Sequence, residues 1–243
     1  MFFLLRPVIP FGGLHSSPRH DAMYPCIPPP FLRTAAIPGD SFFFERWFRA
    51  DEETLIAGVD EAGRGPLAGP VVAACVILPS NCAYHHFRDS KKLTPRQRER
   101  LFTVLHSNGS IVGAGLADVR EIESMNILQA SLLAMQRAVT ACIAAGHGRR
   151  PRYLLVDGRF PIPMPISQLP LIKGESKSAS IAAASIVAKV TRDRLMAEAH
   201  QRYPQYGFAQ HQGYPTGAHR QAIAKHGPCP LHRRTFRGVV EFV

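Results

Sequence analysis

Four carboxylates follow three apolar stretches of the sequence. Asp60 and Glu61 follow the run LIAGV, Asp157 follows YLLV, and Glu175 follows LPLIKG. If these stretches are neighbouring strands of an α/β sheet, their acidic ends converge where loops open the fold to solvent. Like charges placed together repel one another unless a multivalent cation neutralises them. Because the ligands are all oxygens, the pattern predicts a site for Mg²⁺ or Mn²⁺ rather than for zinc or copper.

The chain around these acids is strongly basic. It has 29 Lys and Arg residues against 18 Asp and Glu residues, a formal net charge of +11. Residues 1–53 hold five basic and six acidic side chains, so the positive excess lies in the remainder. A folded domain this basic typically binds a polyanion. An acidic metal site inside a basic surface suits phosphodiester hydrolysis, in which two metal ions about 4 Å apart hold the attacking and leaving oxygens.

A glycine-rich segment, GRGPLAG, begins at Gly63 directly after the paired acids. It lacks the Gly-Lys-Ser/Thr of a P-loop and the spacing of the dinucleotide-binding fingerprint. An ordinary hairpin turn is one interpretation. The other is that the backbone amides of Gly63, Arg64 and Gly65 approach a sugar-phosphate chain and distinguish ribose from deoxyribose.

The cysteines form neither a disulfide framework nor a zinc motif. There are five of them, without C-x-x-C spacing: Cys26, Cys75, Cys82, Cys142 and Cys229. No second cluster completes a ligand set with His226, Cys229 and His232, so we interpret that segment as a histidine-rich surface loop. This cysteine usage indicates a reducing cytoplasm. No apolar run approaches the roughly 20 residues that span a bilayer, so we expect no membrane segment.

The expected elements alternate between strands and helices. We expect strands at 55–59, 69–78 and 110–116 and within 153–158 and 169–176. We expect a helix that begins with Thr94 as N-cap and Pro95 as first residue, and others over about 120–145, 178–203 and 219–226. Residues 1–40 contain eight prolines and no hydrophobic period, which predicts a disordered extension. Residues 41–243 then form one α/β domain, with a mixed sheet and helices on its faces.

Several long motifs resemble bacterial ribonuclease HII, the type 2 ribonuclease H, and occur in that family's order. They are AGVDEAGRGPLAGPV, DSKKL, NILQASLLAMQRAV, LLVDG, KGES with SIAAASIVAKVTRD, and YPQYGFAQHQGYPT, within about residues 55–236. The resemblance implies a ribonuclease H-like fold, with a mixed five-stranded sheet flanked by helices and a helical C-terminal extension over about 203–243. It also implies an endonuclease that cuts the RNA strand of RNA–DNA hybrids. Such an enzyme further incises duplex DNA 5′ to embedded ribonucleotides, leaving 3′-hydroxyl and 5′-phosphate ends.

The resemblance also implies roles for the acids. Asp60, Glu61 and Asp157 match the metal-binding carboxylates. Glu175 stands where the family commonly has aspartate, and its extra methylene moves the carboxylate outward by about one bond length. The resemblance therefore implies that Glu175 assists from the edge, through water or with a shifted ion preference.

Other positions match substrate contacts. Gly63, Arg64 and Gly65 match the turn that contacts the ribonucleotide, and Tyr214 matches the tyrosine that stacks on the following deoxyribose. Lys91 and its neighbour Lys92 are expected phosphate contacts or a solvated basic turn. In the alanine-rich helix we interpret three residues as packing residues: Ser180, Ser185 and Lys189.

Two other functions are compatible with the residues. A basic, non-catalytic nucleic-acid-binding protein would bind tightly and with strong salt dependence, and its acids would merely cap strands. A related nuclease of the same fold, such as a junction resolvase or a transposase-like enzyme, would cut all-DNA duplexes. We expect a monomer, because one chain supplies every acid that the chemistry requires.

Overall fold

The computed structural model describes residues 40–49, 53–87 and 93–243. The predicted disordered extension therefore lies, apart from its last residue, outside the described residues. Lys91 and Lys92 also lie outside them, so their expected phosphate contacts stay a prediction.

A five-stranded sheet forms the centre of the fold, with its strands in the order β3-β2-β1-β4-β5. The strands are β1 (Ile56–Ala62), β2 (Val71–Ile77), β3 (Ile111–Ala117), β4 (Tyr153–Asp157) and β5 (Ser167–Leu171). β2 lies antiparallel to β1 and β3, whereas β4 lies parallel to β1 and β5. The predicted mixed five-stranded sheet is confirmed.

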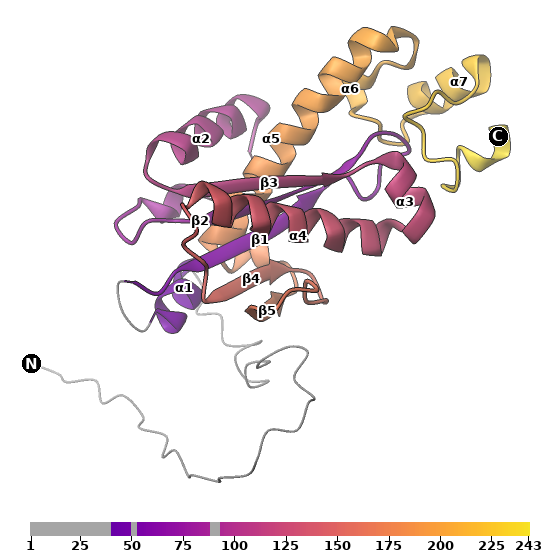
Figure 1. Ribbon diagram of the computed structural model, residues 1–243. Coiled ribbons are helices and arrows are strands. Elements are labelled where there is room, and N and C mark those ends of the chain that lie inside the picture. Colours follow the sequence, from indigo (N-terminus) through magenta and orange to yellow (C-terminus); the bar gives the residue numbers. More distant parts are fainter. Residues whose placement is uncertain (1–39, 50–52, 88–92) are drawn as a thin grey trace, which may run out of the picture.

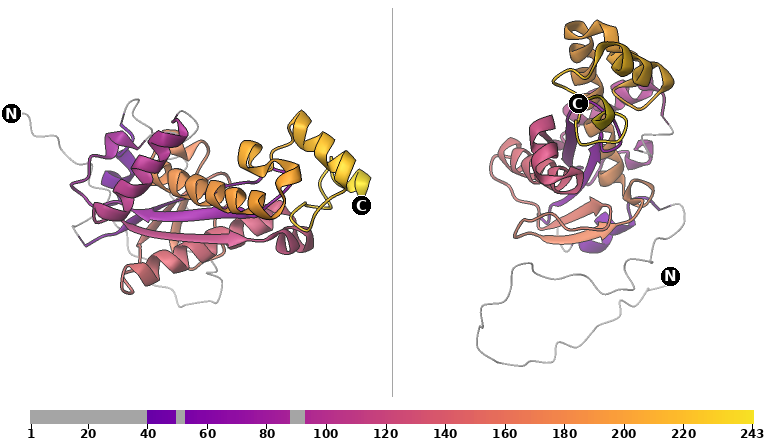
Figure 2. Two further views of the ribbon diagram at one scale, coloured as in Figure 1. Left: turned by 90° about the horizontal axis from the view of Figure 1, so that it is seen from above. Right: turned by 90° about the vertical axis from the view of Figure 1, so that its right-hand side faces the viewer.

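Helices cover both faces of this sheet (Figures 1 and 2). They are α1 (Phe43–Phe48), α2 (Pro95–Ser107), α3 (Val119–Met125), α4 (Ile127–Ala145), α5 (Ala179–Arg202), α6 (Phe208–His211) and α7 (Gly217–His226). α4 packs on one face, and α5 packs on the other with α2 beside it. The predicted start of α2 is confirmed, because the Thr94 side chain accepts a hydrogen bond from the Gln97 N–H and Pro95 occupies the first turn.

Period-2 alternation along β1 divides its side chains between these two helix layers. Ala57 and Val59 belong to the core cluster that includes α4, whereas Ile56 packs with Ile181 of α5. Gly58 faces α5 at very short range, because a Cβ there would lie 2.0 Å from the backbone carbonyl carbon of Ser180. The missing side chain therefore lets the first turn of α5 lie directly on β1.

Two predicted elements have different limits in the structure. The helix expected over about 120–145 is two helices, because Asn126 has φ 73° between α3 and α4. The Asn126 side chain accepts hydrogen bonds from the N–H groups of Leu128 and Gln129, so it caps α4. The strand expected over 169–176 ends at Leu171, and Glu175 lies in the one-turn helix η4 (Gly174–Ser176).

Among the described residues one helix, α4, is long and apolar enough to cross a membrane by length and composition alone. Its Ala134, Ala138 and Cys142 are buried in the main core cluster. A Cβ on Gly113 of β3 would lie 2.1 Å from the backbone nitrogen of Cys142, which shows how closely α4 packs on the sheet. Core helices of this kind pass the same test.

The chain after α5 forms a helical extension at one end of the sheet, as expected (Figure 1). It contains η5 (Pro204–Tyr206), α6, α7 and η6 (Val240–Phe242). Tyr206 and Phe208 pack with Met196 of α5 and with Ala68, which lies between β1 and β2. The extension therefore contacts the glycine-rich segment that follows the paired acids.

Candidate active site

The register of two parallel strands brings the first two acids together. Val59 of β1 lies opposite Val156 of β4, so Asp60 and Asp157 follow side by side at the carboxyl ends of their strands. Both side chains point toward α5, because alternate residues share a face and Leu155, two positions before Asp157, packs with α5. The parallel register of β1 and β4 thus brings two of the four acids to one edge of the sheet.

Glu175 completes a compact acidic group with these two aspartates. One carboxylate oxygen from each of Asp60, Asp157 and Glu175 lies within 4.8 Å of the others. The Gly174 N–H donates a hydrogen bond to Asp157 Oδ1 at 2.6 Å, which ties η4 to the end of β4. The Glu175 carboxylate therefore lies within the acidic group, closer to the two aspartates than the expected position at its edge.

Glu61 lies beside this group and is directed differently. As the neighbour of Asp60 in β1, it points to the opposite face of the sheet. Its Oε1 lies 3.3 Å from Arg64 Nη1, whereas its buried Oε2 has no hydrogen-bond partner among the described residues. Burial raises the pKa of Glu61, and the nearby Arg64 guanidinium partly opposes that rise. A buried carboxylate oxygen without a partner is what a cation or its bound water would satisfy.

The pKa of Asp60 shows that the acids repel one another. Burial raises the pKa of Asp60 well above its ordinary value, and the charges of Glu61, Asp157 and Glu175 raise it further. A hydrogen bond from the Ser185 side chain acts in the opposite direction on this pKa. Asp60 interacts with each of the other three acids, so it is the electrostatic centre of the site.

A cavity of about 260 Å³ opens over the acids and collects most of the predicted site residues. Its lining comprises Asp60, Glu61, Ala62, Gly63, Arg64, Gly65, Arg98, Asp157, Glu175, Ser185, Lys189 and Tyr214. All four acids, the glycine-arginine-glycine turn and Tyr214 are therefore brought together. The cavity is a shared site for an acidic centre and a basic, partly aromatic rim.

Three further lining residues were missed or misinterpreted in the sequence. Ser185 and Lys189, which we had interpreted as packing residues, line the cavity together with Arg98 of α2. Packing is the wrong role for Ser185, because its side chain is hydrogen bonded to Asp60. A signal was present, since 181, 185 and 189 fall on one helical face and Ile181 is the residue that contacts the sheet.

Tyr214 forms the outer wall of the cavity. Its side chain is 41% exposed, so its ring is available to a ligand. Lys189 Nζ lies 5.8 Å and Arg192 Cζ 6.0 Å from the ring centroid. A Cβ on Gly65 would lie 3.9 Å from Tyr214 Cε1, which is van der Waals contact, so the ring lies directly beside the turn.

The predicted histidine-rich surface loop is wrong for two of its three residues. His232 is 1% and Cys229 6% exposed, and only His226 lies on the surface. The His232 ring packs against Tyr206 and Phe208. Burial arises because the C-terminal segment folds back onto η5 and α6, a contact that local sequence does not reveal.

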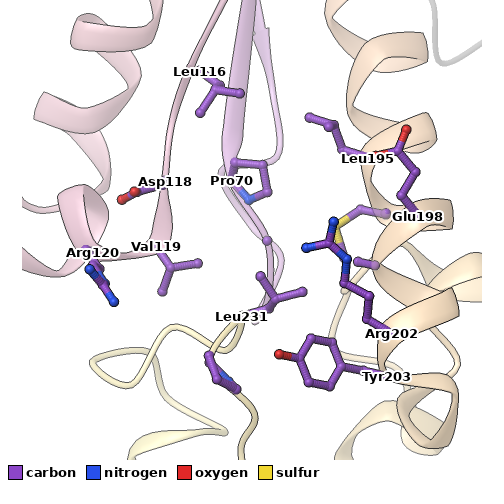
Figure 3. Close-up of a pocket in the computed structure, with 14 residues that line it drawn as sticks. Pro70, Leu116, Asp118, Val119, Arg120, Leu195, Glu198, Arg202, Tyr203 and Leu231 are labelled. Atoms are coloured by element: carbon purple, nitrogen blue, oxygen red, sulfur yellow. The ribbon is translucent and has the colours of Figure 1, made fainter.

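A second and larger cavity, of about 430 Å³, lies between α5, the start of α3 and the C-terminal extension (Figure 3). Its walls are mainly apolar and include Leu116, Val119, Met196 and Leu231. Of the predicted site residues that the structure describes, none lines it. In the described part of the chain, the predicted site residues therefore gather at the acidic cavity rather than at this one.

Comparisons with known proteins agree with this geometry. The sequence matches the family Ribonuclease HII over residues 57–239. Ribonuclease HII of Desulfotalea psychrophila is 54% identical over 207 residues, covering 85% of this chain and 91% of the relative. Ribonuclease HII of Geobacter sulfurreducens is 58% identical over 186 residues, covering 76% and 83%. The ribonuclease H2 structure from Pyrococcus horikoshii has a TM-score of 0.62 at 28% identity, covering 78% of this chain and 97% of that chain.

Proposed function

The chain belongs to the ribonuclease HII family, which degrades the RNA of RNA–DNA hybrids, and is a ribonuclease H enzyme; we propose that it also incises duplex DNA 5′ to embedded ribonucleotides. The products would carry 3′-hydroxyl and 5′-phosphate ends. The observation that carries the proposal is the convergence of Asp60, Asp157 and Glu175 under a cavity that Tyr214 and the glycine-arginine-glycine turn enclose. We further propose that it acts as a monomer, because one chain supplies the whole acidic group. We propose the cytoplasm as its location, because its cysteine usage fits a reducing compartment.

The acidic group fits divalent metal ions, Mg²⁺ or Mn²⁺. All of its donors are carboxylate oxygens, which hard ions prefer, and their mutual repulsion needs a positive charge. Asp60, Asp157 and Glu175 would hold the ions, and the unpartnered Oε2 of Glu61 would add a ligand directly or through water. Bound there, two ions would lower the pKa of a water that attacks the phosphorus and would stabilise the leaving 3′ oxygen.

The protein's own residues have the task of placing the scissile phosphate. Arg98 and Lys189 supply positive charge at the cavity wall, where they would attract the phosphates on either side. Ser185 holds Asp60 in orientation through its hydrogen bond. Backbone amides of the turn at Gly63, together with the ring of Tyr214, would recognise the ribose and the sugar that follows it. Lys91 would add a phosphate contact.

One experiment separates this proposal from its rivals. The protein is incubated with Mg²⁺ and three substrates: an all-DNA duplex, an RNA–DNA hybrid, and a DNA duplex with one ribonucleotide. We expect cleavage of the second and third substrates and none of the first. A nuclease of the resolvase type would cut the first, and a non-catalytic binding protein would cut none. If the protein cuts the hybrid but not the duplex with one ribonucleotide, the proposed incision at embedded ribonucleotides is wrong.

A further inference from the structure

Two arginines are fully buried behind the glycine-rich segment, and backbone carbonyls satisfy them. Arg192 of α5 and Arg233 are both 0% exposed. The Arg192 guanidinium donates hydrogen bonds of 3.0 Å to three carbonyl oxygens, those of Pro70, Ala68 and Gln212. The Arg233 guanidinium donates to three others, those of Gly63, Arg64 and Gly69. Both side chains thus use the planar fork of arginine to fix backbone rather than to pair with a carboxylate.

The carbonyls that Arg233 binds determine where the turn directs its amides. In a trans peptide the C=O and the following N–H point in opposite directions. The carbonyls of Gly63 and Arg64 point inward to Arg233, so the N–H groups of Arg64 and Gly65 point away from it. Both residues line the acidic cavity, and neither amide donates to a backbone carbonyl in the described part of the chain. Arg233 therefore holds two amide donors toward the ligand side.

Arg192 connects this turn to the segment that carries Tyr214. Its Nη1 donates to the Gln212 carbonyl and its Nη2 to the Ala68 carbonyl, so one guanidinium binds both segments. The Leu67 N–H donates to the Gly213 carbonyl at 2.8 Å and locks the two segments together. No side chain fits between them, because a Cβ on Gly213 would lie 2.6 Å from the Ala68 oxygen. The separation of turn and ring is therefore fixed from behind.

Two histidines bind the backbone carbonyl of Tyr214 through one chain of hydrogen bonds, which begins at Cys229. The Cys229 N–H donates to His232 Nδ1 at 2.9 Å, so the His232 proton is on Nε2. His232 Nε2 lies 3.1 Å from His219 Nε2 and donates to it. His219 then carries its proton on Nδ1 and donates it to the Tyr214 carbonyl at 2.9 Å. The chain of donors requires both rings to be neutral.

These four residues form one unit behind the cavity, which we call the arginine–histidine brace: Arg192, His219, His232 and Arg233. None of them lines the acidic cavity, yet together they fix both the turn at 63–65 and Tyr214. We propose that the arginine–histidine brace positions the turn and Tyr214 so that the enzyme selects a ribonucleotide followed by a deoxyribonucleotide. Its members are positioning residues, and the inference rests on the proposed function.

The first test compares the specificity of the wild type with that of Arg233→Lys. Lysine keeps the charge but cannot bind three carbonyls in one plane. We expect kcat/KM on the single-ribonucleotide duplex to fall at least about tenfold more than kcat/KM on the hybrid, since small misplacements of recognition groups are costly. Both substrates are measured with saturating Mg²⁺ at a temperature where circular dichroism shows the variant folded.

A second pair of variants keeps the test decisive if Arg233→Lys does not fold. His219→Gln retains a donor for the Tyr214 carbonyl and an acceptor for His232, whereas His219→Leu retains neither. We expect the glutamine variant to keep the wild-type ratio of the two kcat/KM values and the leucine variant to lose it. The control is Ile111→Val, a buried change at the start of β3, whose partner Ile77 lies opposite Ala57 rather than the acidic end of β1; it should lower the melting temperature and leave the ratio unchanged.

The outcomes distinguish the inference from the function on which it rests. If the wild type does not cut the single-ribonucleotide duplex, the proposed function itself fails. If the wild type cuts it, but the brace variants lose activity on both substrates in equal proportion, the brace is only structural and the inference is overturned.

Discussion

The acidic group and the arginine–histidine brace both contain buried charge, on opposite sides of the turn at Gly63. They differ in the partners that their charged side chains have within the fold. Each guanidinium of the brace has three backbone carbonyls as partners within the fold. The acids have one another, with ligand oxygens within 4.8 Å, and a Glu61 oxygen without a partner. At that separation two like charges repel by about 3.5 kcal/mol with an effective dielectric constant of about 20.

The two groups differ in what surrounds the buried charge: backbone carbonyl oxygens in the brace, and charges of the same sign among the three clustered acids. A buried guanidinium that donates hydrogen bonds to buried carbonyls leaves those carbonyls without partners when it is removed, so its loss destabilises the fold. A buried charge surrounded by like charges destabilises the fold until a ligand binds. Substitution of a brace arginine should therefore lower the stability of the fold, whereas neutralising one of the acids should leave stability unchanged or raise it.

The largest effect is expected for Asp60→Asn. The amide keeps the shape and removes the charge at the centre of the acidic group, so metal-dependent cleavage of the single-ribonucleotide duplex should fall by about 10³-fold or more. The melting temperature in EDTA should stay level or rise, because repulsion is relieved. Cleavage near the wild-type rate would exclude Asp60 from the metal site.

Arg233→Met should have the opposite effect on stability. It leaves three buried carbonyls without their donor, which should lower the free energy of unfolding by about 3 kcal/mol in urea titration. The neighbouring Arg234 is exposed, and Arg234→Met serves as the matched control, with a change within about 0.5 kcal/mol. Equal changes in the two variants would contradict the role of the brace.

The histidines of the brace should make stability depend on pH. Burial lowers the pKa of His219 and of His232 from 6.5 to about 4. Between these values the unfolded rings bind protons and the folded ones do not, so stability should fall as pH drops from 6.5 toward 4. The loss is at most about 1.4 kcal/mol per pH unit for each ring.

Thermal melts across this range measure that slope. The raised pKa of Asp60 also contributes to the slope, so the informative quantity is the difference between variants. His219→Gln should flatten the slope, whereas His226→Gln, a change of an exposed histidine, should leave it as in the wild type. A slope that His219→Gln does not change would place the titration elsewhere.

The smallest effect is expected for Glu175→Asp. Its carboxylate lies inside the acidic group, and shortening it by one methylene withdraws the oxygen from its partners. The Mg²⁺ concentration that gives half-maximal activity should rise by about threefold to tenfold. Glu175→Gln, which keeps the length and loses the charge, should raise it further; a lower value for either variant would show that Glu175 is not a ligand.

Much of the fold followed from local chemistry that the sequence displays directly. Thr94 and Pro95 define a helix start by capping alone, and the acids after LIAGV and YLLV lie side by side because parallel strands end together. The break at Asn126 was missed because a positive φ depends on the side chain capping the next helix. The ends of a helix were therefore harder to predict than its existence.

The charged residues of the site could be predicted from the sequence. Side-chain directions and burial that depend on tertiary contacts could not. Asp60, Glu61 and Asp157 could be found from strand ends, whereas Glu175 lies in η4 beyond the end of β5. The direction of Glu61 depends on which face of β1 its side chain takes. The hydrogen bond between Ser185 and Asp60 depends on how α5 packs on β1, which the sequence does not show. The burial of His232 and Arg233 depends on a segment folding back onto residues more than 150 positions earlier, such as Gly63.

The most direct test of the account is the melting temperature of the wild type and of Asp157→Asn over a range of Mg²⁺ concentrations. If the acids tolerate one another only with a divalent ion, the wild-type melting temperature rises with Mg²⁺ as expected for a ligand of the native state. The variant should start higher in EDTA and respond weakly. Identical melting temperatures for both proteins at every Mg²⁺ concentration would contradict the account.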